Sequence, residues 1–266
     1  MRTFSFGGGV QSTAVLALQA LGELPKPYDV YLFSNVGNDS EDPETISYFH
    51  NHHLPFAEKH GIRIIELIKE SRGRENETLW EQLHRMEVKS IQIPSYRVGK
   101  GPGGRKCTRD YKIRVVRKWQ RQNGSSKDNP VVMGLGISVD EIQRARTSSR
   151  HEDQILEYPL IDLGMDRDDC FEVIKRAGLP TPPRSACFFC PFHSKKAWID
   201  QKENRPELFA KSVALEKVLL ERCEIHGKEP EYLSRYGVPL EEAFSNYGNI
   251  PDDDGPEGCE EASCFT

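Results

Sequence analysis

The first eighteen residues carry the pattern that most constrains the fold. An apolar run at residues 3–6 (Thr-Phe-Ser-Phe) leads into residues 7–13 (Gly-Gly-Gly-Val-Gln-Ser-Thr), and residues 14–18 (Ala-Val-Leu-Ala-Leu) are typical of a helix. Glycines permit positive φ and close approach of the backbone to a ligand, while a helix start presents unpaired N–H groups to an anion. The pattern predicts a strand, a phosphate loop and a helix. A glycine-rich turn without a ligand is the alternative.

Strand-like and helix-like segments alternate through the first half of the chain. Strands are expected at residues 29–33, 62–67 and 130–135, and helices at 43–60, 75–88 and 110–122, with a loop around 99–104. Parallel strands joined by helices form a twisted sheet with helices on both faces and bind ligands at the carboxyl ends of the strands. We therefore predict an α/β fold with a mostly parallel sheet.

The pattern of strands fades after residue 166. Helices are expected at 167–177, 195–204 and 206–223, and residues 251–266 are acidic and glycine-containing. The predicted organisation is an α/β nucleotide-binding domain at 1–165, a helical extension at 166–250 and an acidic mobile tail at 251–266.

Composition limits the class of protein. The chain has 266 residues, 37% of them hydrophobic, and a formal net charge of −5. No apolar run approaches the roughly 20 residues of a membrane span. We expect a soluble cytoplasmic protein that does not bind a membrane.

Two of the seven cysteines form a C-x-x-C pair, Cys187-Phe188-Phe189-Cys190. This spacing can aim two thiolates at an iron–sulfur cluster or at zinc. A redox pair or two ordinary buried thiols are the alternatives. Cys170 and Cys223 fall in helical, partly apolar contexts and are expected to be packed side chains.

Gly8, Gly9 and Ser12, with Gly7 in place of a first Ser and Gln11 in place of an Asp, align with a loop of the form S-G-G-x-D-S. This loop resembles that of the adenine nucleotide alpha hydrolase-like superfamily of PP-loop ATP pyrophosphatases, and it is the first of five ordered elements that resemble this superfamily. The other four resemble elements of the branch that contains phosphoadenosine phosphosulfate reductases, DNA-phosphorothioation and tRNA-thiolation proteins. They are Asn35-Val36-Gly37-Asn38 with Pro43-Glu44-Thr45, Cys107-Thr108-x-x-x-Lys112, Gly136-Ile137-x-x-Asp140-Glu141-x-x-Arg144, and Tyr158-Pro159-Leu160-Ile161-Asp162.

The resemblance implies a site for ATP or a sulfonucleotide, with Mg²⁺. Its expected cofactor-binding residues are Ser5, Gly7, Gly8, Gly9, Gln11, Ser12, Thr13, Phe33, Ser34 and Asn35, and its expected catalytic residues are Lys112, Asp140, Glu141 and Arg144. Arg144 suits a phosphate or sulfate, or alternatively pairs with Asp140 or Glu141 on its own helix. The two acidic residues bind Mg²⁺ or merely begin a helix.

The cysteines separate three hypotheses. In the first, Cys107, Cys187 and Cys190 hold a [4Fe-4S] cluster, and the protein is an ATP-dependent sulfur transferase acting on a nucleic acid or nucleotide-like substrate. The second is a sulfonucleotide reductase of the phosphoadenosine phosphosulfate or adenylylsulfate type, although the vicinal Cys-Cys of adenylylsulfate reductases is missing. The third is a nucleotide-binding module clipped by Zn²⁺. Cys259 and Cys264 in the tail are a fourth ligand, a resolving thiol or neither.

A basic stripe runs from Arg97 to Gln122, a segment that contains ten Lys or Arg and only one acidic residue, an Asp. With its interleaved aromatic residues it suits tRNA or DNA, and a solvated helix face is the alternative. A sulfur-donor protein is a further expected partner of a sulfur transferase.

Overall fold

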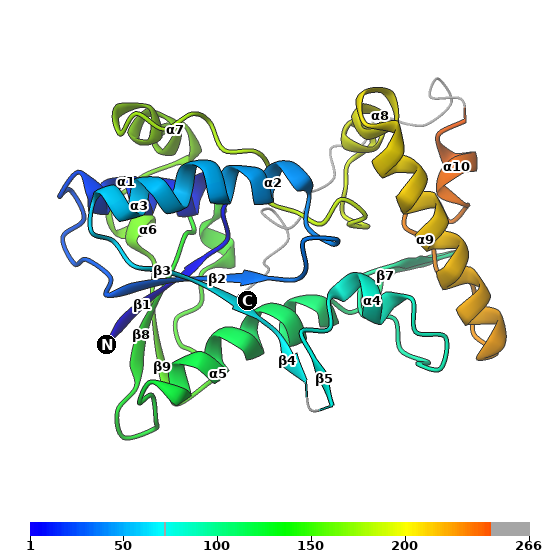
Figure 1. Ribbon diagram of the computed structural model, residues 1–266, viewed down its shortest axis with the longest axis horizontal. Helices are drawn as coiled ribbons and strands as arrows, with labels where there is room; N and C mark the ends of the chain where they lie inside the picture. Colours follow the sequence, from blue (N-terminus) through cyan, green and yellow to red (C-terminus); the bar gives the residue numbers. More distant parts are fainter. Residues whose placement is uncertain (72, 246–266) are drawn as a thin grey trace.

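The computed structural model describes residues 1–71 and 73–245, and its centre is a five-stranded parallel sheet (Figure 1). The strand order is β3-β2-β1-β8-β9. The strands are β1 (Arg2–Phe6), β2 (Val30–Asn35), β3 (Ile64–Ile68), β8 (Val131–Leu135) and β9 (Gln154–Glu157). The predicted α/β fold with a parallel sheet is confirmed. Strand β9 forms one edge of the sheet and was not predicted from the sequence.

Alternation along the strands gives the sheet two buried faces. Phe4 and Phe6 of β1 lie beside Tyr31 and Phe33 of β2 and pack against the helix α1 (Val10–Ala20). On the opposite face, Leu32 and its neighbours pack against α5 (Arg114–Gln122). Because both faces are covered, the strands are nearly continuous apolar runs.

A long helical stretch and α7 accompany α1 on its face of the sheet. The stretch consists of α2 (Pro43–Tyr48), a π-helical turn (Phe49–His53) and α3 (Leu54–Lys59), which together confirm the predicted helix at 43–60. Its N-terminus is capped by the Asp42 carboxylate, which accepts the N–H of Glu44 at 3.0 Å. Helix α7 (Arg167–Arg176) packs in the same core as α1, so a segment assigned to the extension belongs physically to the sheet body.

Two local predictions were wrong. The helix expected at 75–88 is only α4 (Leu79–Leu83), because Thr78 and Glu81 form a capping box that starts the helix at residue 79. The residues before it pair in a hairpin of β4 (Glu70–Ser71) and β5 (Arg74–Glu75). The loop expected around 99–104 also contains a hairpin, formed by β6 (Tyr96–Arg97) and β7 (Lys100–Pro102).

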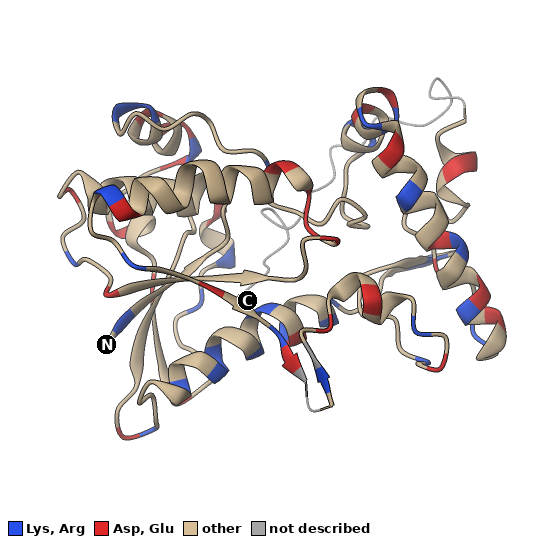
Figure 2. Ribbon diagram, in the orientation of Figure 1, with Lys and Arg blue, Asp and Glu red and all other residues tan. Residues whose placement is uncertain are grey.

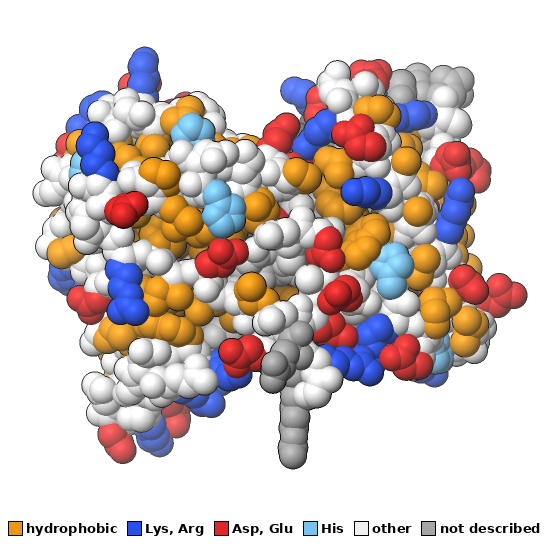
Figure 3. All heavy atoms as spheres, viewed as in Figure 1, with side chains coloured by type: hydrophobic (Ala, Val, Ile, Leu, Met, Phe, Trp, Pro, Cys, Tyr) orange, Lys and Arg blue, Asp and Glu red, His pale blue; other side chains and the backbone are white. Residues whose placement is uncertain are grey.

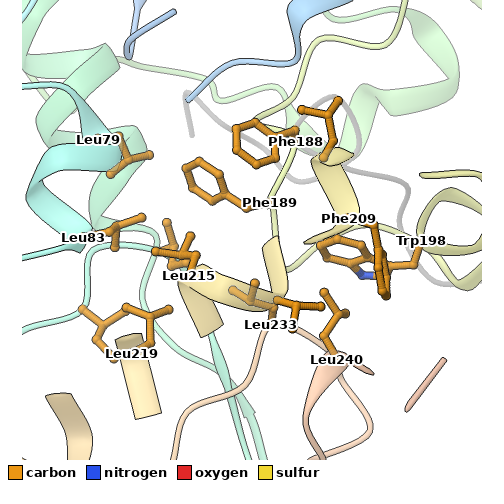
Figure 4. Close-up of a cluster of buried hydrophobic side chains, with 14 of the residues drawn as sticks. Leu79, Leu83, Phe188, Phe189, Trp198, Phe209, Leu215, Leu219, Leu233 and Leu240 are labelled. Carbon is orange, nitrogen blue, oxygen red and sulfur yellow. The ribbon is translucent and has the colours of Figure 1, made fainter. Parts of the chain in front are cut away.

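A second core lies beside the sheet body and is formed largely by helices (Figure 4). Its helices are α8 (Lys195–Asn204), α9 (Pro206–Ile225) and α10 (Leu240–Ala243), the first two in the predicted places. Leu79 and Leu83 of α4 enter the same core, so it draws on both halves of the sequence. The space-filling view shows a notch between the two parts of the molecule along the upper edge (Figure 3).

The remaining helical segments are short. They are a π-helical turn (Thr108–Ile113) that leads into α5, a 3₁₀ segment (Val139–Arg144) and α6 (Pro159–Asp162). Within the two described ranges, no helix is long and apolar enough to cross a membrane. The predicted tail at 251–266, with Cys259 and Cys264, lies outside the described residues.

Candidate functional site

The strand order reverses at β1, which is where an open parallel sheet forms a crevice at its carboxyl edge. The chain leaves β1 through Gly7 and leaves the neighbouring β8 through Gly136. A Cβ at Gly136 would lie 3.2 Å from the Ser12 nitrogen and 3.3 Å from the Gln11 carbonyl carbon. The two glycine-containing segments that the sequence singled out therefore lie in contact.

The glycine loop has the backbone geometry that a phosphate loop requires. Gly8 has a φ of +80°, which side-chain-bearing residues rarely adopt, and Gly9 is the N-cap of α1. The hydroxyls of Ser12 and Thr13 donate to the Gly9 carbonyl at 3.0 and 2.8 Å. Both hydroxyls thus brace the turn, and the backbone N–H groups of the first helical turn are left as the anion donors.

His53 supports the loop from behind, which the sequence analysis missed. Its Nε2 lies 2.8 Å from the Thr13 hydroxyl, and the side chain is 1% exposed. Burial lowers the pKa of His53 to about 3, so the imidazole is neutral at physiological pH. The sequence offered three neighbouring histidines in one helix and no way to select the one that faces the loop.

Four buried hydroxyls belong to separate elements. Ser5 and Ser34 lie one residue before the ends of β1 and β2, Ser138 follows β8 by three residues, and Thr108 begins the π-helical turn after Cys107. Among the described residues, none of their side-chain oxygens has a hydrogen-bond partner. Buried polar groups are usually paired, so the three hydroxyls at or just past the ends of strands leave hydrogen-bonding capacity for a polar ligand there. Ser5 and Ser34 were predicted site residues, whereas Thr108 and Ser138 were not.

Phe33 and Asn35, which were also predicted to contact the nucleotide, make contacts that stabilise the fold. The Phe33 ring stacks on Phe49 with centroids 4.1 Å apart and is 2% exposed. The Asn35 amide nitrogen donates to Asn38 and Glu66 at 2.7 and 2.6 Å, and its oxygen accepts the N–H of Gly37. These contacts shape the turn after β2. A role for Phe33 and Asn35 beside adenine stays a prediction.

Glu141 is the acidic residue that faces the loop. It accepts a hydrogen bond from the Gln11 amide at 3.3 Å and forms an ion pair with Arg144 at 2.6 Å. The ion-pair alternative for Arg144 is therefore present, beside the loop. Asp140 is exposed, and its charge acts on Cys170, whose thiol pKa is raised to about 12 mainly by burial and further by Asp140.

The segment that carries the C-x-x-C pair binds directly to the loop region, although nearly 180 residues separate them. The Ser185 hydroxyl donates to the Gly7 carbonyl at 2.5 Å, and the Asp42 N–H donates to the Ala186 carbonyl at 2.9 Å. The Phe188 N–H also reaches the Ser40 carbonyl at 3.3 Å. Tertiary structure thus joins the two strongest motifs of the sequence.

The three candidate ligand cysteines lie in the same region of the molecule. Cys187 and Cys190 share a turn in which the Cys190 N–H donates to the Cys187 carbonyl at 3.0 Å. Cys107 and Cys187 are both half-buried and pack against the second core. Still, no group of three His, Cys, Asp or Glu side chains in the described part of the chain is placed to hold a metal ion.

The other two described cysteines are packed side chains, as predicted. Cys170 lies in the sheet body and Cys223 in the second core, both buried. Burial raises the pKa of the Cys223 thiol as it does that of Cys170. Neither thiol has the electropositive, exposed setting of a reactive cysteine.

Lys and Arg of the basic stripe run along α5 (Figure 2). In the described part of the chain, four carboxylates pair with six of the ten cations of the stripe: Glu229 with Lys100, Asp110 with Arg109 and Arg114, Glu70 with Lys118, and Asp153 with Arg117 and Arg121. Sequence counting found only one acid within the stripe and could not see the three others. The predicted catalytic residue Lys112 lies within the basic stripe and is half-buried in the π-helical turn before α5.

Comparison with known proteins returns no match to any family model, to any curated protein or to any solved structure.

Proposed function

We propose that this protein is an ATP-dependent sulfur transferase of the PP-loop type that modifies a nucleic acid or a nucleotide-like substrate. One observation carries the nucleotide site. The crevice at the strand-order reversal combines a positive-φ glycine loop with the N-terminus of an eleven-residue helix, and the buried hydroxyls of Ser5 in β1 and Ser138 after β8 have no partner among the described residues. These groups suit the phosphates and sugar of an adenine nucleotide.

Different residues of the crevice would bind the phosphates and the Mg²⁺ of the nucleotide. The backbone of residues 7–9 and the first turn of α1 would receive the phosphates. Glu141 would supply the carboxylate for Mg²⁺, a metal that prefers oxygen ligands. Gln11 stands where the resembled motif has an Asp, and Glu141 lies 3.3 Å from it, so an acidic oxygen occupies the same neighbourhood from another element. ATP bound there would activate the acceptor by adenylation and release pyrophosphate.

Cys107, Cys187 and Cys190 are the proposed sulfur-handling residues. The hydrogen bond from Ser185 to Gly7 supports this role, since it anchors the cysteine segment beside the proposed phosphate site. A [4Fe-4S] cluster on these thiols would supply an iron that carries sulfide, and Zn²⁺ would supply only a structural clip. Because the described side chains are not arranged as a three-ligand set, we derive no reaction step through a metal.

The nucleotide site is tested by Gly8→Ala against Gly7→Ala. Alanine at Gly8 must adopt a φ of +80°, whereas a Cβ at Gly7 would have no atom within 4 Å in the described structure. We expect ATP affinity to fall at least about tenfold for Gly8→Ala, a loss of about 1.4 kcal/mol, and to stay within about twofold for Gly7→Ala. Unchanged affinity in both variants would contradict the loop assignment.

Reaction products separate the sulfur transferase from the reductase. With ATP, a sulfur source and tRNA or DNA, we expect AMP, pyrophosphate and a thiolated acceptor. Sulfite released from a sulfonucleotide without ATP turnover would favour reduction.

The ligand cysteines are tested by metal analysis. Iron, sulfide and zinc are measured after anaerobic purification of the full chain, with Cys187→Ala expected to lose metal and Cys170→Ala to retain it. Retention of metal by Cys187→Ala would remove that residue from the ligand set.

A further inference from the structure

A cavity of about 210 Å³ lies on the face of the sheet that α5 covers. Its floor is apolar and is formed by side chains from the π-helical turn, α5, β8 and β9: Ile113, Val116, Met133 and Leu156. The volume is below the roughly 300–1,000 Å³ of sites for drug-sized ligands. The cavity therefore suits one compact ring rather than a whole nucleoside triphosphate.

The rim of the cavity is cationic. Three arginines, Arg109, Arg146 and Arg150, lie on it together with His151, and the described lining contains no Asp or Glu. Arg146 is half-buried and Arg150 is exposed, and no carboxylate of the described residues forms an ion pair with either. Both guanidinium groups thus remain available to an anion.

The acidic residues around the cavity are already paired. Four of them adjoin lining residues in the sequence, and each forms an ion pair: Asp110 with Arg109 and Arg114, Glu152 with Lys127, Asp153 with Arg117 and Arg121, and Glu157 with Arg2. Two of the four carboxylates are each shared by two arginines. The surroundings of the rim therefore do not cancel the charge of Arg146 and Arg150.

Tyr158 holds the backbone of Arg146 in place. The Tyr158 hydroxyl accepts the N–H of Arg146 at 2.8 Å and donates to the Arg146 carbonyl at 3.1 Å. Both backbone groups of one rim arginine are thus bound by a single side chain that follows β9. Binding a ligand at Arg146 then requires little further ordering of the backbone, which lowers the entropic cost.

His151 adds an aromatic ring to the rim. Burial, and then the positive charge of Arg117, lowers the pKa of His151, so the imidazole is neutral at physiological pH. Its backbone N–H donates to the Ser149 hydroxyl at 3.0 Å, which fixes the turn that carries it. Histidine is one of the side chains on which unstacked bases are held in single-stranded nucleic acids.

The walls of the cavity continue from both halves of the proposed ATP-dependent site. Arg109 follows Cys107 by two residues, and Arg146 follows Arg144 by two. Arg144 pairs with Glu141, whose carboxylate accepts the Gln11 amide beside the glycine loop. A ligand in the cavity is therefore held by segments that lead directly from the cysteine and from the loop.

We propose that this cavity holds one base of a single-stranded nucleic acid, with the flanking phosphates at Arg146 and Arg150. The planar guanidinium groups bind phosphate oxygens in pairs. The apolar floor and the His151 ring hold the base through its flat face, which every base has. The assignment of this strand as the acceptor rests on the proposed function, whereas its binding requires neither ATP nor a metal.

The experiment measures fluorescence anisotropy of a labelled short single-stranded oligonucleotide, as RNA and as DNA, with the full-length protein and no ATP. An abasic strand of the same length carries the phosphates alone. We expect the intact strand of at least one of the two to bind about fivefold or more tightly than its abasic counterpart. Equal affinity of intact and abasic strands would overturn the proposal.

The phosphate contacts are tested by the double variant Arg146→Gln/Arg150→Gln. We expect oligonucleotide affinity to fall about tenfold or more, and the slope of log affinity against log salt to become shallower by about 0.7 for each lost contact. Lys127→Gln removes an exposed cation outside the cavity lining and should change both quantities little. Unchanged affinity in the double variant would overturn the proposal.

The base contact is tested by Ile113→Gln, which places a polar group in the floor. This variant should lose the preference for the intact over the abasic strand while keeping the salt slope. If it fails to fold, the double arginine variant still decides, because it changes only side chains at the rim. A nucleoside monophosphate that binds as tightly as the oligonucleotide would contradict the nucleic-acid assignment.

The two proposed sites fail by separate measurements. Gly8→Ala should weaken ATP and leave oligonucleotide affinity within about twofold, whereas Arg146→Gln/Arg150→Gln should do the reverse. Loss of oligonucleotide binding in Gly8→Ala would place the strand in the ATP crevice and overturn this inference. Unchanged ATP affinity in Gly8→Ala would contradict only the loop assignment.

Discussion

The glycine loop and the segment that carries the C-x-x-C pair meet at the hydrogen bond from Ser185 to Gly7, but they are held by different means. The loop is fixed by the sheet body, with β1, β8 and α1 packed around it and His53 buried behind. The cysteine turn is fixed by its own two central residues, since Phe188 and Phe189 enter the second core beside Trp80. One half of the site thus depends on backbone geometry, and the other on side chains buried in a separate core.

The largest expected difference between the two regions follows from removing one of the two phenylalanine side chains that hold the cysteine turn. Phe189 is fully buried, so Phe189→Ala should destabilise the protein by about 3–5 kcal/mol in chemical denaturation. Peptide-resolved alkylation should show faster reaction of Cys187 and Cys190, with ATP affinity little changed. Leu16→Ala, in the sheet body, is the counterpart and should cost about 2–5 kcal/mol without exposing the two thiols. Equal exposure of the thiols in both variants would mean that the two cores unfold as one unit.

The role of the glycine-loop region in ATP binding is tested by replacing one carboxylate. Glu141 contacts Gln11 while its neighbour Asp140 is exposed, so the two acids should not be equivalent. We expect Glu141→Gln to weaken ATP about tenfold in the presence of Mg²⁺ and little in its absence. Asp140→Asn should leave both affinities unchanged, as measured by titration calorimetry. A larger effect from Asp140→Asn would reverse the assignment.

A third expected effect is a pH dependence of stability due to His53. Burial depresses its folded-state pKa to about 3, so the unfolded chain binds the proton more readily. The stabilisation is complete above the unfolded pKa of about 6.5 and is lost as the pH falls towards 3, by up to about 1.4 kcal/mol per unit. His53→Gln should flatten the slope of unfolding free energy between pH 6.5 and 5. An unchanged slope in His53→Gln would show that another group titrates.

Local chemistry explains which elements were predictable. The helix from Pro43 was found because a proline start and the Asp42 cap act within a few residues. The helix expected at 75–88 was misjudged because strand pairing of Glu75 with Glu70 and the Thr78 cap competed with helical periodicity. A short edge strand such as β9 has too few residues to show a pattern of its own.

The sequence by itself determined the strand, glycine loop and helix and the parallel α/β architecture. Spacing and backbone freedom act over a few residues, so these features can be read along the chain. Only the tertiary structure decided that Gly136 closes on Ser12, that Ser185 binds Gly7, and that the basic stripe finds its carboxylates in distant segments. These contacts depend on how elements far apart in the sequence pack together, and a local sequence pattern does not predict that packing.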